Sequence, residues 1–377
     1  MSTLKVTNIE SPNGGGVNAK IADINGGQLS NRNLITNGAM QVAQRGTSAT
    51  VADNSNEGYS TLDQWAIYYN SSMSGAVTFS QSSDAPSGFA NSAKLQCSTT
   101  NTSITGNQYL KLVNKIEAQN CQLLDYGSSG AKSSILSWYM KTDTYTGPVS
   151  VSLEIEGGQE YFTVSVTPTT SWARYTLAIP GSTSQAIADD NGEGLTLHFA
   201  LAGSTSSSNA ASSDSTAWSS TRSDYRTDIG NLLSNTSNAF YVTGVQLEVG
   251  DVATAFEHRS FGDELAKCQR YYYRTAVLSN DSTIAAGFNQ NANAVRAVVH
   301  FPVTMRTAPT ALEQSGTASD VSIYHGTSLT VCTGVPSFNS ATQHCAEFQA
   351  NTTGLTAGQG CTVSLETTGY LAWSAEL

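Results

Sequence analysis

Charged residues are scarce in this sequence. Asp, Glu, Lys and Arg make up 12% of the 377 residues, with 18 basic against 29 acidic side chains and a net charge of −11. Proteins that bind nucleic acids or anionic membranes do so through clusters of Lys and Arg, and this sequence contains no run of them. The composition therefore argues against nucleic acid and against an anionic membrane surface as partners.

Long apolar runs are also missing. A membrane-spanning helix needs about 20 predominantly apolar residues, and no stretch of the sequence approaches that length. The opening residues, MSTLKVTNIESPNGGGVNAK, lack the apolar segment and the cleavage site of a secretory signal peptide. We therefore expect a protein that is made in the cytoplasm, carries no signal peptide and does not insert into a membrane.

The six cysteines form no C-x-x-C motif and are too sparse for a disulfide framework. We expect them to be buried free thiols. Cys332, His344, Cys345 and Cys361 follow none of the familiar spacings of zinc ligands. The glycine-rich NGGGV near the N-terminus lacks the Lys and the Ser or Thr of a phosphate-binding loop. The sequence thus predicts no metal and no cofactor.

Apolar residues recur at every second position over much of the chain between Asn33 and about Arg259. Clear examples are the ranges 149–155, 173–179, 195–201 and 240–249. This period is that of a strand with one buried face. Clusters of Gly, Pro, Asn and Asp, such as TYTGP and DDNGEG, separate the strands. Because no crossover helix lies between them, we predict an antiparallel sandwich of the jelly-roll type.

The stretch GVQLEVGDVATAFEHRSFGDELAKCQRYYYR, from Gly244 to Arg274, differs from the rest because it holds nine charged residues. An active site, a hinge and an assembly joint are the candidate explanations. Adjacent residues on a strand point to opposite faces, so Glu257 and His258 would not converge on one substrate. We therefore expect no catalytic role here and expect Arg259 to pair with Glu257.

The same stretch changes its period at Ser260. Ser260 and Asp263 have the spacing of a capping box, which predicts a helix over roughly Gly262–Arg274. Four residues at helical spacing would share one face of this helix: Phe261, Leu265, Cys268 and Tyr272. A helix of this length is marginal alone, so we expect it to pack against neighbours and to join two modules.

The expected fold class is all-β, with the chain divided into four parts. After the helix the period of two returns, for example over 295–301, and predicts a second, smaller β-sandwich. The parts are an N-terminal attachment segment (1–33), the jelly roll (34–260), the connecting helix (261–275) and the second sandwich (276–377). Residues 1–33 are too short and too rich in glycine to build a core, so a disordered tail remains the alternative.

Several blocks of the sequence resemble parts of bacteriophage tail-fibre proteins. NRNLITNGAMQVAQRGTS (Asn31–Ser48), followed by YSTLDQWAIYY (Tyr59–Tyr69), resembles the start of a module that is common in these fibres, and the charged stretch described above resembles its end. FPVTMRTAPT (Phe301–Thr310) and the closing LAWSAEL resemble the domain that often follows. The N-terminal LKVTNIESPNGGGV also resembles the start of many phage structural proteins.

This resemblance implies a homotrimeric receptor-binding fibre or spike of the virion, with a jelly roll similar to carbohydrate-binding domains and with no catalytic residues. Residues 1–33 would contact other tail or capsid proteins. The chain has no long shaft of repeats or coiled coil between this segment and the first module, which leaves a short fibre or an appendage on another part of the particle. We expect the helix to lie near the threefold axis of the trimer.

Candidate glycan-binding residues lie in loops of both sandwiches. Trp218 stands alone in the Ser-rich loop Gly203–Asp224, where its ring could stack on a sugar. Its candidate hydrogen-bonding partners are Arg222, Asp224 and Tyr225. Burial of Trp218 against its own sandwich fits the sequence equally well. In the second sandwich, the candidate receptor contacts flank two turns: Tyr324, His325, Phe338 and His344.

Three functions remain open at this point. The first is a non-enzymatic virion protein that attaches to a polysaccharide or other receptor on the host surface, which suits a low charge because neutral sugars are bound by hydroxyl and amide groups. The second is a purely structural appendage of the tail or capsid that makes only protein contacts. The third, a polysaccharide depolymerase, needs paired acids in a cleft. We interpret Glu154 and Glu156 as part of a flat, solvated face instead.

Overall fold

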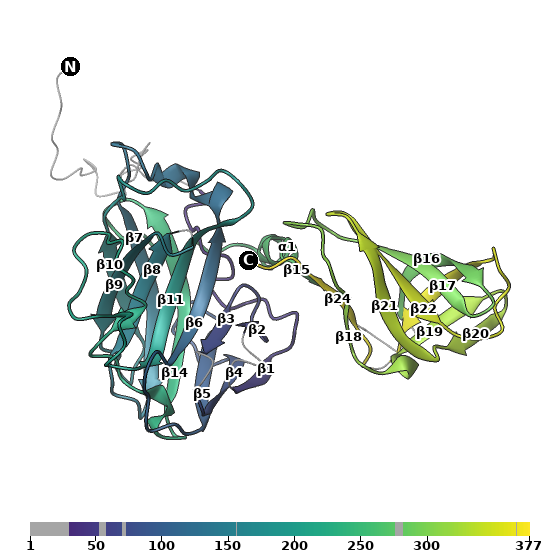
Figure 1. Cartoon of the computed structure of the whole chain (residues 1–377), viewed down its shortest axis with the longest axis horizontal. Helices are drawn as coiled ribbons and strands as arrows, with labels where there is room; N and C mark the ends of the chain where they lie inside the picture. The colour runs from purple at the N-terminus through teal and green to yellow at the C-terminus, as the bar shows by residue number, and fades with distance from the viewer. Residues whose placement is uncertain (1–29, 53–57, 70–72, 156, 276–281, 367) are drawn as a thin grey trace, which may run out of the picture.

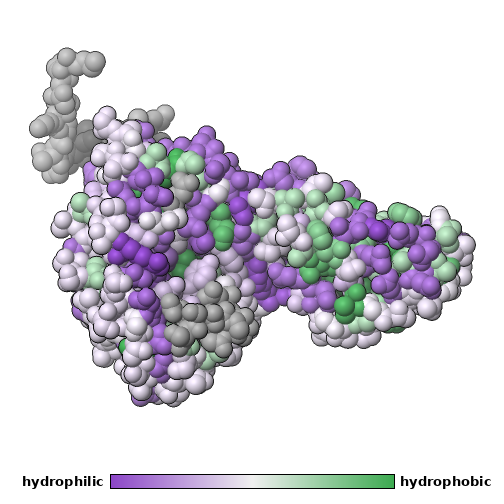
Figure 2. Space-filling view, viewed as in Figure 1, coloured by the Kyte–Doolittle hydropathy of each residue, from purple (hydrophilic) through white to green (hydrophobic). Residues whose placement is uncertain are grey.

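The computed structural model describes residues 30–52, 58–69, 73–155, 157–275, 282–366 and 368–377. Strands β1–β14 form a large module and strands β15–β24 form a small module. Within the small module, β15 and β24 lie on the side nearest the large module, next to the connecting helix α1 (Figure 1). Most of the surface in Figure 2 is hydrophilic or neutral in character. No described helix is long and apolar enough to cross a membrane. All six cysteines are free; five are buried and Cys345 is half-buried, which largely confirms the expectation of buried thiols.

The large module is a sandwich of two six-stranded sheets in which every pairing is antiparallel. The first sheet has the order β1-β4-β5-β14-β7-β10: Ser48–Ala52, Ala76–Ser82, Ser92–Thr99, Ala239–Val249, Ser134–Asp143 and Ala173–Ile179. The second has the order β2-β3-β6-β11-β8-β9: Gly58–Tyr59, Ala66–Tyr69, Tyr109–Glu117, Glu193–Gly203, Val149–Ile155 and Glu160–Val166. The expectation of an all-β fold built on a sandwich is confirmed.

Alternate side chains of both sheets fill the space between them, as the period of two predicts. Phe199 of β11 is fully buried in this core. Its ring lies 5.9–6.3 Å, between centroids, from the rings of Trp65, Trp138 and Phe240. Aromatic contacts of this kind stabilise a core beyond the area that they bury. Trp65 and Trp138 are therefore core residues.

The small module contains a seven-stranded sheet and a three-stranded sheet around a separate core. The order of the larger sheet is β20-β19-β23-β16-β17-β22-β21: Ser328–Val331, Val321–His325, Gly360–Leu365, Ser282–Asn291, Ala294–His300, Cys345–Asn351 and Gly334–Ala341. The order of the smaller sheet is β15-β24-β18: Tyr272–Arg274, Leu371–Ser374 and Glu313–Gln314. The described residues also contain short 3-10 helices, labelled η2 (Ala118–Leu124), η3 (Leu232–Ser234) and η4 (Ala318–Asp320), and two short strands, β12 (Ala210–Ala211) and β13 (Tyr225–Arg226).

The helix between the modules is shorter than expected. α1 covers Phe261–Gln269, and the Ser260 side chain accepts a hydrogen bond from the backbone N–H of Asp263, as the capping pattern predicts. The expected continuation to residue 274 or 275 is wrong. Tyr272–Arg274 form β15 instead, because their backbone groups pair with β24 in the three-stranded sheet.

The four residues expected on one helical face consequently separate. Cys268 is buried, Leu265 is half-buried and Phe261 is 57% exposed. Tyr272 is buried, but it lies on β15 and not on the helix. The helix therefore presents Phe261 and part of Leu265 to the surface, which is a smaller face than the sequence predicts.

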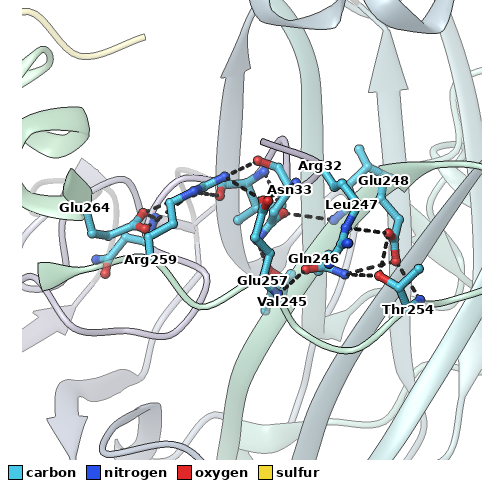
Figure 3. Close-up of polar contacts among 12 residues, drawn as sticks. Arg32, Asn33, Val245, Gln246, Leu247, Glu248, Thr254, Glu257, Arg259 and Glu264 are labelled. Atoms are coloured by element: carbon cyan, nitrogen blue, oxygen red, sulfur yellow. Dashed lines mark hydrogen bonds and ion pairs between the residues drawn. The ribbon is translucent and has the colours of Figure 1, made fainter. Parts of the chain in front are cut away.

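Arg259 lies at the centre of the polar network where the chain leaves the large module (Figure 3). Its guanidinium donates to the backbone carbonyls of Asn33 and Ile35, and it lies 3.7 Å from Glu257 and 3.3 Å from Glu264. The expected pair of Arg259 with Glu257 is thus confirmed. Asn33, at the end of the expected attachment segment, is 5% exposed and belongs to this network. Residues 1–29 of that segment lie outside the described residues.

A buried carboxylate ties the end of β6 to the chain that follows α1. Glu117 is fully buried and accepts hydrogen bonds from the Arg270 guanidinium at 2.6 and 2.8 Å and from the Tyr271 hydroxyl at 2.7 Å. Burial acts to raise the pKa of Glu117, but these three bonds hold it below its ordinary value. The carboxylate therefore stays ionised and fixes the large module to the first residues of the small module.

A second carboxylate ties the C-terminal end of the chain to the large module. Glu376 accepts hydrogen bonds from Arg45 at 3.0 Å and from Gln64 at 2.6 Å. The Arg45 guanidinium also lies over the ring of Tyr272, 3.4 Å from its centroid. Burial raises the pKa of Glu376 to about 7, although Arg45 acts in the opposite direction. The contact between the modules therefore depends on pH.

We predict that Glu376 makes folding stability fall as the pH rises from about 4.5 to about 7. A carboxyl group with a raised pKa binds its proton more tightly in the folded chain, so its contribution is complete below the unfolded pKa and is lost as the pH rises through the folded one. The shift corresponds to about 3 kcal/mol. Urea unfolding across this range measures the slope. Glu376→Gln should flatten it, and a variant with the slope of the parent chain would refute the assignment.

Candidate functional site

The outer face of the second sheet of the large module carries a pocket of about 350 Å³. Lys111 and Lys115 of β6, His198 of β11 and Glu154 of β8 point into it, because alternate residues of the same strands point into the core. The full lining is Tyr68, Tyr109, Lys111, Val113, Lys115, Glu154, Gly157, Glu193, Thr196, His198, Arg222 and Asp224. Three adjacent strands thus form the floor of the pocket.

The Ser-rich segment 204–224 supplies one wall of the pocket. It lies on the outer face of β8 and β9, where the Ser152 hydroxyl donates to the backbone carbonyl of Asp224 at 3.0 Å and the Thr163 hydroxyl donates to that of Ser223 at 2.5 Å. Strand hydroxyls therefore satisfy backbone groups of the segment that would otherwise be buried without a partner. The sequence predicts a flat face here, and the covering segment is the reason why the face is hollowed.

Lys111 and Asp224 form the most deeply buried ion pair of the pocket. Lys111 Nζ lies 3.3 Å from Asp224 Oδ1, and the two side chains are 4% and 2% exposed. Burial lowers the pKa of Lys111 despite the carboxylate beside it. Burial acts to raise the pKa of Asp224, but Lys111 and Arg222 together hold it below its ordinary value. Asp224 therefore stays ionised and positions two cations at the wall.

Two further pairs complete the charges of the pocket. Lys115 Nζ lies 2.8 Å from Glu193 Oε2, and His198 Nε2 lies 3.3 Å from Glu154 Oε2. Burial lowers the pKa of His198, and the charge of Lys111 acts in the same direction, so His198 is neutral at pH 7. The remaining charges then balance, three against three: Lys111, Lys115 and Arg222 with Glu154, Glu193 and Asp224.

Two tyrosine rings add apolar surface to this balanced set of charges. Tyr68 and Tyr109 are half-buried and line the pocket. The ammonium group of Lys111 lies 4.3 Å from the ring centroid of Tyr109, and that of Lys115 lies 5.9 Å from that of Tyr68. Rings that present a face beside fixed donors and acceptors suit a ligand with both apolar and hydroxyl surfaces. The pocket can therefore hold an uncharged ligand rich in hydroxyl groups.

The structure places only part of the expected loop site at this pocket. Arg222 and Asp224 line it, as described above. Trp218 does not, because its ring packs 5.8 Å from Tyr126 and 5.9 Å from Phe162 while its Nε1 donates to a backbone carbonyl. Of the two alternatives for Trp218, the structure shows packing against its own sandwich, with the side chain half-buried.

Tyr225 is also withdrawn from the surface. Its side chain is fully buried, and its hydroxyl donates to the backbone carbonyl of Ser204 at 3.2 Å. It packs with Ala200 and Ile229 in a small core beneath the segment that forms the wall. Its role is therefore to support the wall, and the expected hydrogen bond from Tyr225 to a ligand has no geometric basis in this structure.

The expected contact residues of the small module do not form one surface. Tyr324 of β19 is 42% exposed, and the neighbouring His325 lies 2.9 Å from the Thr330 hydroxyl. Phe338 of β21 packs against the core of the small module, whereas His344 is exposed. Because four strands separate β19 from β21 in the sheet, the two pairs lie apart.

The sequence interpretation missed several residues of the pocket. The sequence predicts a solvated face for Glu154, and Tyr109, Lys111 and Lys115 of β6 are not among the predicted site residues. Their signal is the outward half of the strand YLKLVNKIE, where an aromatic and two charged residues alternate with apolar ones in a chain that has little charge. Among the described residues, no group of three or more His, Cys, Asp or Glu side chains is arranged to hold a metal ion.

Comparisons with known proteins give similarity in structure alone. No protein-family model matches the chain, and no curated protein matches it. Solved structures that match include the enzymatically active domain of tailspike protein 4 of bacteriophage CBA120, at 11% identity and a TM-score of 0.30 over 58% of this chain and 21% of that one. A CBM4 module matches at 15% identity and a TM-score of 0.28, over 57% of this chain and 99% of the module. The family 11 carbohydrate-binding module of the Clostridium thermocellum cellulase Lic26A-Cel5E matches at 14% identity and a TM-score of 0.28, over 55% of this chain and 97% of the module.

We predict that Lys111→Met destabilises the chain by about 2 kcal/mol, because the buried carboxylate of Asp224 then keeps only the partly exposed Arg222 as its partner. Urea unfolding measures the loss. The double variant Lys111→Met/Asp224→Asn should recover part of it, since the unpaired charge is removed as well. A loss below about 1 kcal/mol, which is typical of an exposed pair, would contradict the burial of this ion pair.

Proposed function

We propose that the chain is a non-enzymatic fibre or spike protein of a phage virion and that the pocket on β6, β8 and β11 binds glycans of the host surface. The observation that carries the proposal is the combination of two half-buried tyrosine rings with charges that balance. Neutral sugars present hydroxyl groups to such donors and acceptors and C–H faces to aromatic rings. A charged ligand would find no excess of opposite charge there.

The ionisation of the acidic residues supports binding without cleavage. Glycoside hydrolysis needs one carboxyl group with a raised pKa to protonate the leaving oxygen. In the pocket, Lys115 holds the pKa of Glu193 below its ordinary value, and Lys111 does the same for Asp224, although burial acts upward on both. Glu154 is paired with His198. Glu193 and Asp224 therefore serve as fixed acceptors in the proposed site.

Attachment and assembly complete the proposal. Residues 1–33 anchor the chain to other tail or capsid proteins, and three copies form the fibre or spike. Single pockets of this size bind sugars weakly, so linking several copies raises the overall affinity for a surface that repeats the same glycan. The proposal rests for these parts on the resemblance of the sequence to tail-fibre proteins.

An array of bacterial surface polysaccharides and their oligosaccharides tests the proposed site. The chain should bind at least one neutral glycan, and Tyr109→Ala should weaken that binding by about tenfold or more, because loss of one aromatic contact costs on the order of 1.4 kcal/mol. Tyr139→Ala is the matched control, since Tyr139 is half-buried on β7 in the opposite sheet. The Tyr139→Ala variant should bind the glycan as tightly as the parent chain does.

Three results would overturn the proposal. Binding to no member of the array would favour a structural virion component that makes only protein contacts. Release of shorter oligosaccharides from a bound polysaccharide would show that the protein is a depolymerase. Equal losses in Tyr109→Ala and Tyr139→Ala, with both variants folded by circular dichroism, would place the binding site outside the pocket.

A further inference from the structure

Exposed hydrophobic side chains are concentrated on the small module. Among the described residues, eight large hydrophobic side chains are exposed, and six of them lie on β16–β21: Phe288, Val298, Tyr324, Leu329, Val331 and Val335. The other two, Val252 and Phe261, lie near the exit of the large module. Figure 2 shows hydrophobic surface on the small module beside hydrophilic surface. Scattered exposed hydrophobic residues need no explanation, but a contiguous set does.

The register of the seven-stranded sheet brings these residues together. Five residues on five adjacent strands, β20, β19, β23, β16 and β17, are paired one to the next in a single row: Leu329, Tyr324, Thr362, Ala286 and Val298. Their neighbours along each strand, such as Ile323 and Ala297, point into the core of the small module. The row therefore lies on the outer face of the sheet.

Phe288 and Val331 extend the row on its two sides. Phe288 follows Ala286 by two residues on β16, is 51% exposed and lies opposite Gly360, which has no side chain to cover it. Val331 follows Leu329 by two residues on β20 and is 47% exposed. We call the row together with Phe288 and Val331 the apolar face. It is a sheet face that no described part of the same chain covers.

The apolar face contains no acidic or strongly basic residue. The strands β16, β19, β20 and β23 have no Asp, Glu, Lys or Arg at any position. At the edge of the face, Arg296 of β17 lies opposite Phe288 and Glu347 of β22 lies opposite Val298. These two side chains neutralise each other in an ion pair at 2.6 Å. A chain with a net charge of −11 repels its own copies, so an uncharged face is where two copies approach at the lowest electrostatic cost.

We propose that the apolar face binds a second copy of this chain. Outside the small module, the described residues expose only two large hydrophobic side chains, Val252 and Phe261. The surface that matches the apolar face in hydrophobic character is therefore the same face of another copy. The five strands are four to ten residues long, so at about 4.8 Å between strands and about 3.3 Å per residue the whole outer face of these strands, which includes the apolar face, is on the order of 500 Å². Two such faces bury on the order of 1,000 Å², which reaches the size at which specific interfaces begin.

This inference differs from the expectation that the helix joins three copies near a threefold axis, because two copies that pair through the same face are related by a twofold axis. α1 is nine residues long and exposes Phe261 and part of Leu265, whereas the apolar face offers seven side chains on five strands. The area of the sheet face favours it as the primary contact. The inference does not depend on glycan binding, because the apolar face and the pocket lie on different modules.

Sedimentation velocity of the full chain over a wide range of concentration tests the apolar face. The parent chain should sediment as an oligomer. Leu329→Asp and Phe288→Asp, on separate strands, should each raise the dissociation constant by about 100-fold or more, because each buries an unpaired carboxylate between the copies. Phe261→Asp is the matched control on α1 and should assemble as the parent chain does.

Each other result overturns the inference. A parent chain that is monomeric at all concentrations excludes a second copy as the occupant. Assembly that persists in Leu329→Asp and Phe288→Asp excludes this face, and dissociation in Phe261→Asp alone assigns the contact to the helix. Both face residues are about half exposed, so circular dichroism and thermal unfolding should match the parent chain. If one variant is misfolded, the other gives the result.

Discussion

The buried carboxylate of Glu117 is the contact on which the arrangement of the whole chain depends. It closes strand β6 at one end and receives Arg270 and Tyr271, the residues that lead from α1 into the small module. A carboxylate that is fully buried needs every one of these donors, since removal of a donor leaves an uncompensated charge. One strand of the large module is thereby connected to the start of the small module.

The same strand forms the floor of the pocket. β6 presents Tyr109, Lys111 and Lys115 outward on its way to Glu117, so the position of the pocket and the position of the joint are set by one element. The scarcity of charge makes this concentration informative. Charges are retained at the pocket and at the joint, and both places hold pairs of opposite sign: Lys111–Asp224, Lys115–Glu193 and Arg270–Glu117. Paired charges give directional hydrogen bonds without net attraction for ions.

Much of the fold follows from the period of two, because strands such as Val149–Ile155 and Ala239–Val249 bury alternate side chains in any sandwich. The helix cap at Ser260 also follows from local chemistry. The end of the helix and the pocket do not, since both depend on pairing between distant residues. Tyr272 leaves the helix to pair with Ser374, and Asp224 meets Lys111 after more than a hundred residues of chain. Trp218 was ambiguous for the same reason, because the partners that bury it are remote in sequence.

A crystal structure of the chain with an oligosaccharide that it binds on an array tests the central claim most directly. That claim is that the outer face of β6, β8 and β11 is a glycan site. The account predicts a sugar ring against Tyr109 or Tyr68, with its hydroxyl groups bonded to the charged side chains that line the pocket. A sugar bound on the small module or on the opposite sheet of the large module, with this pocket empty, would contradict it.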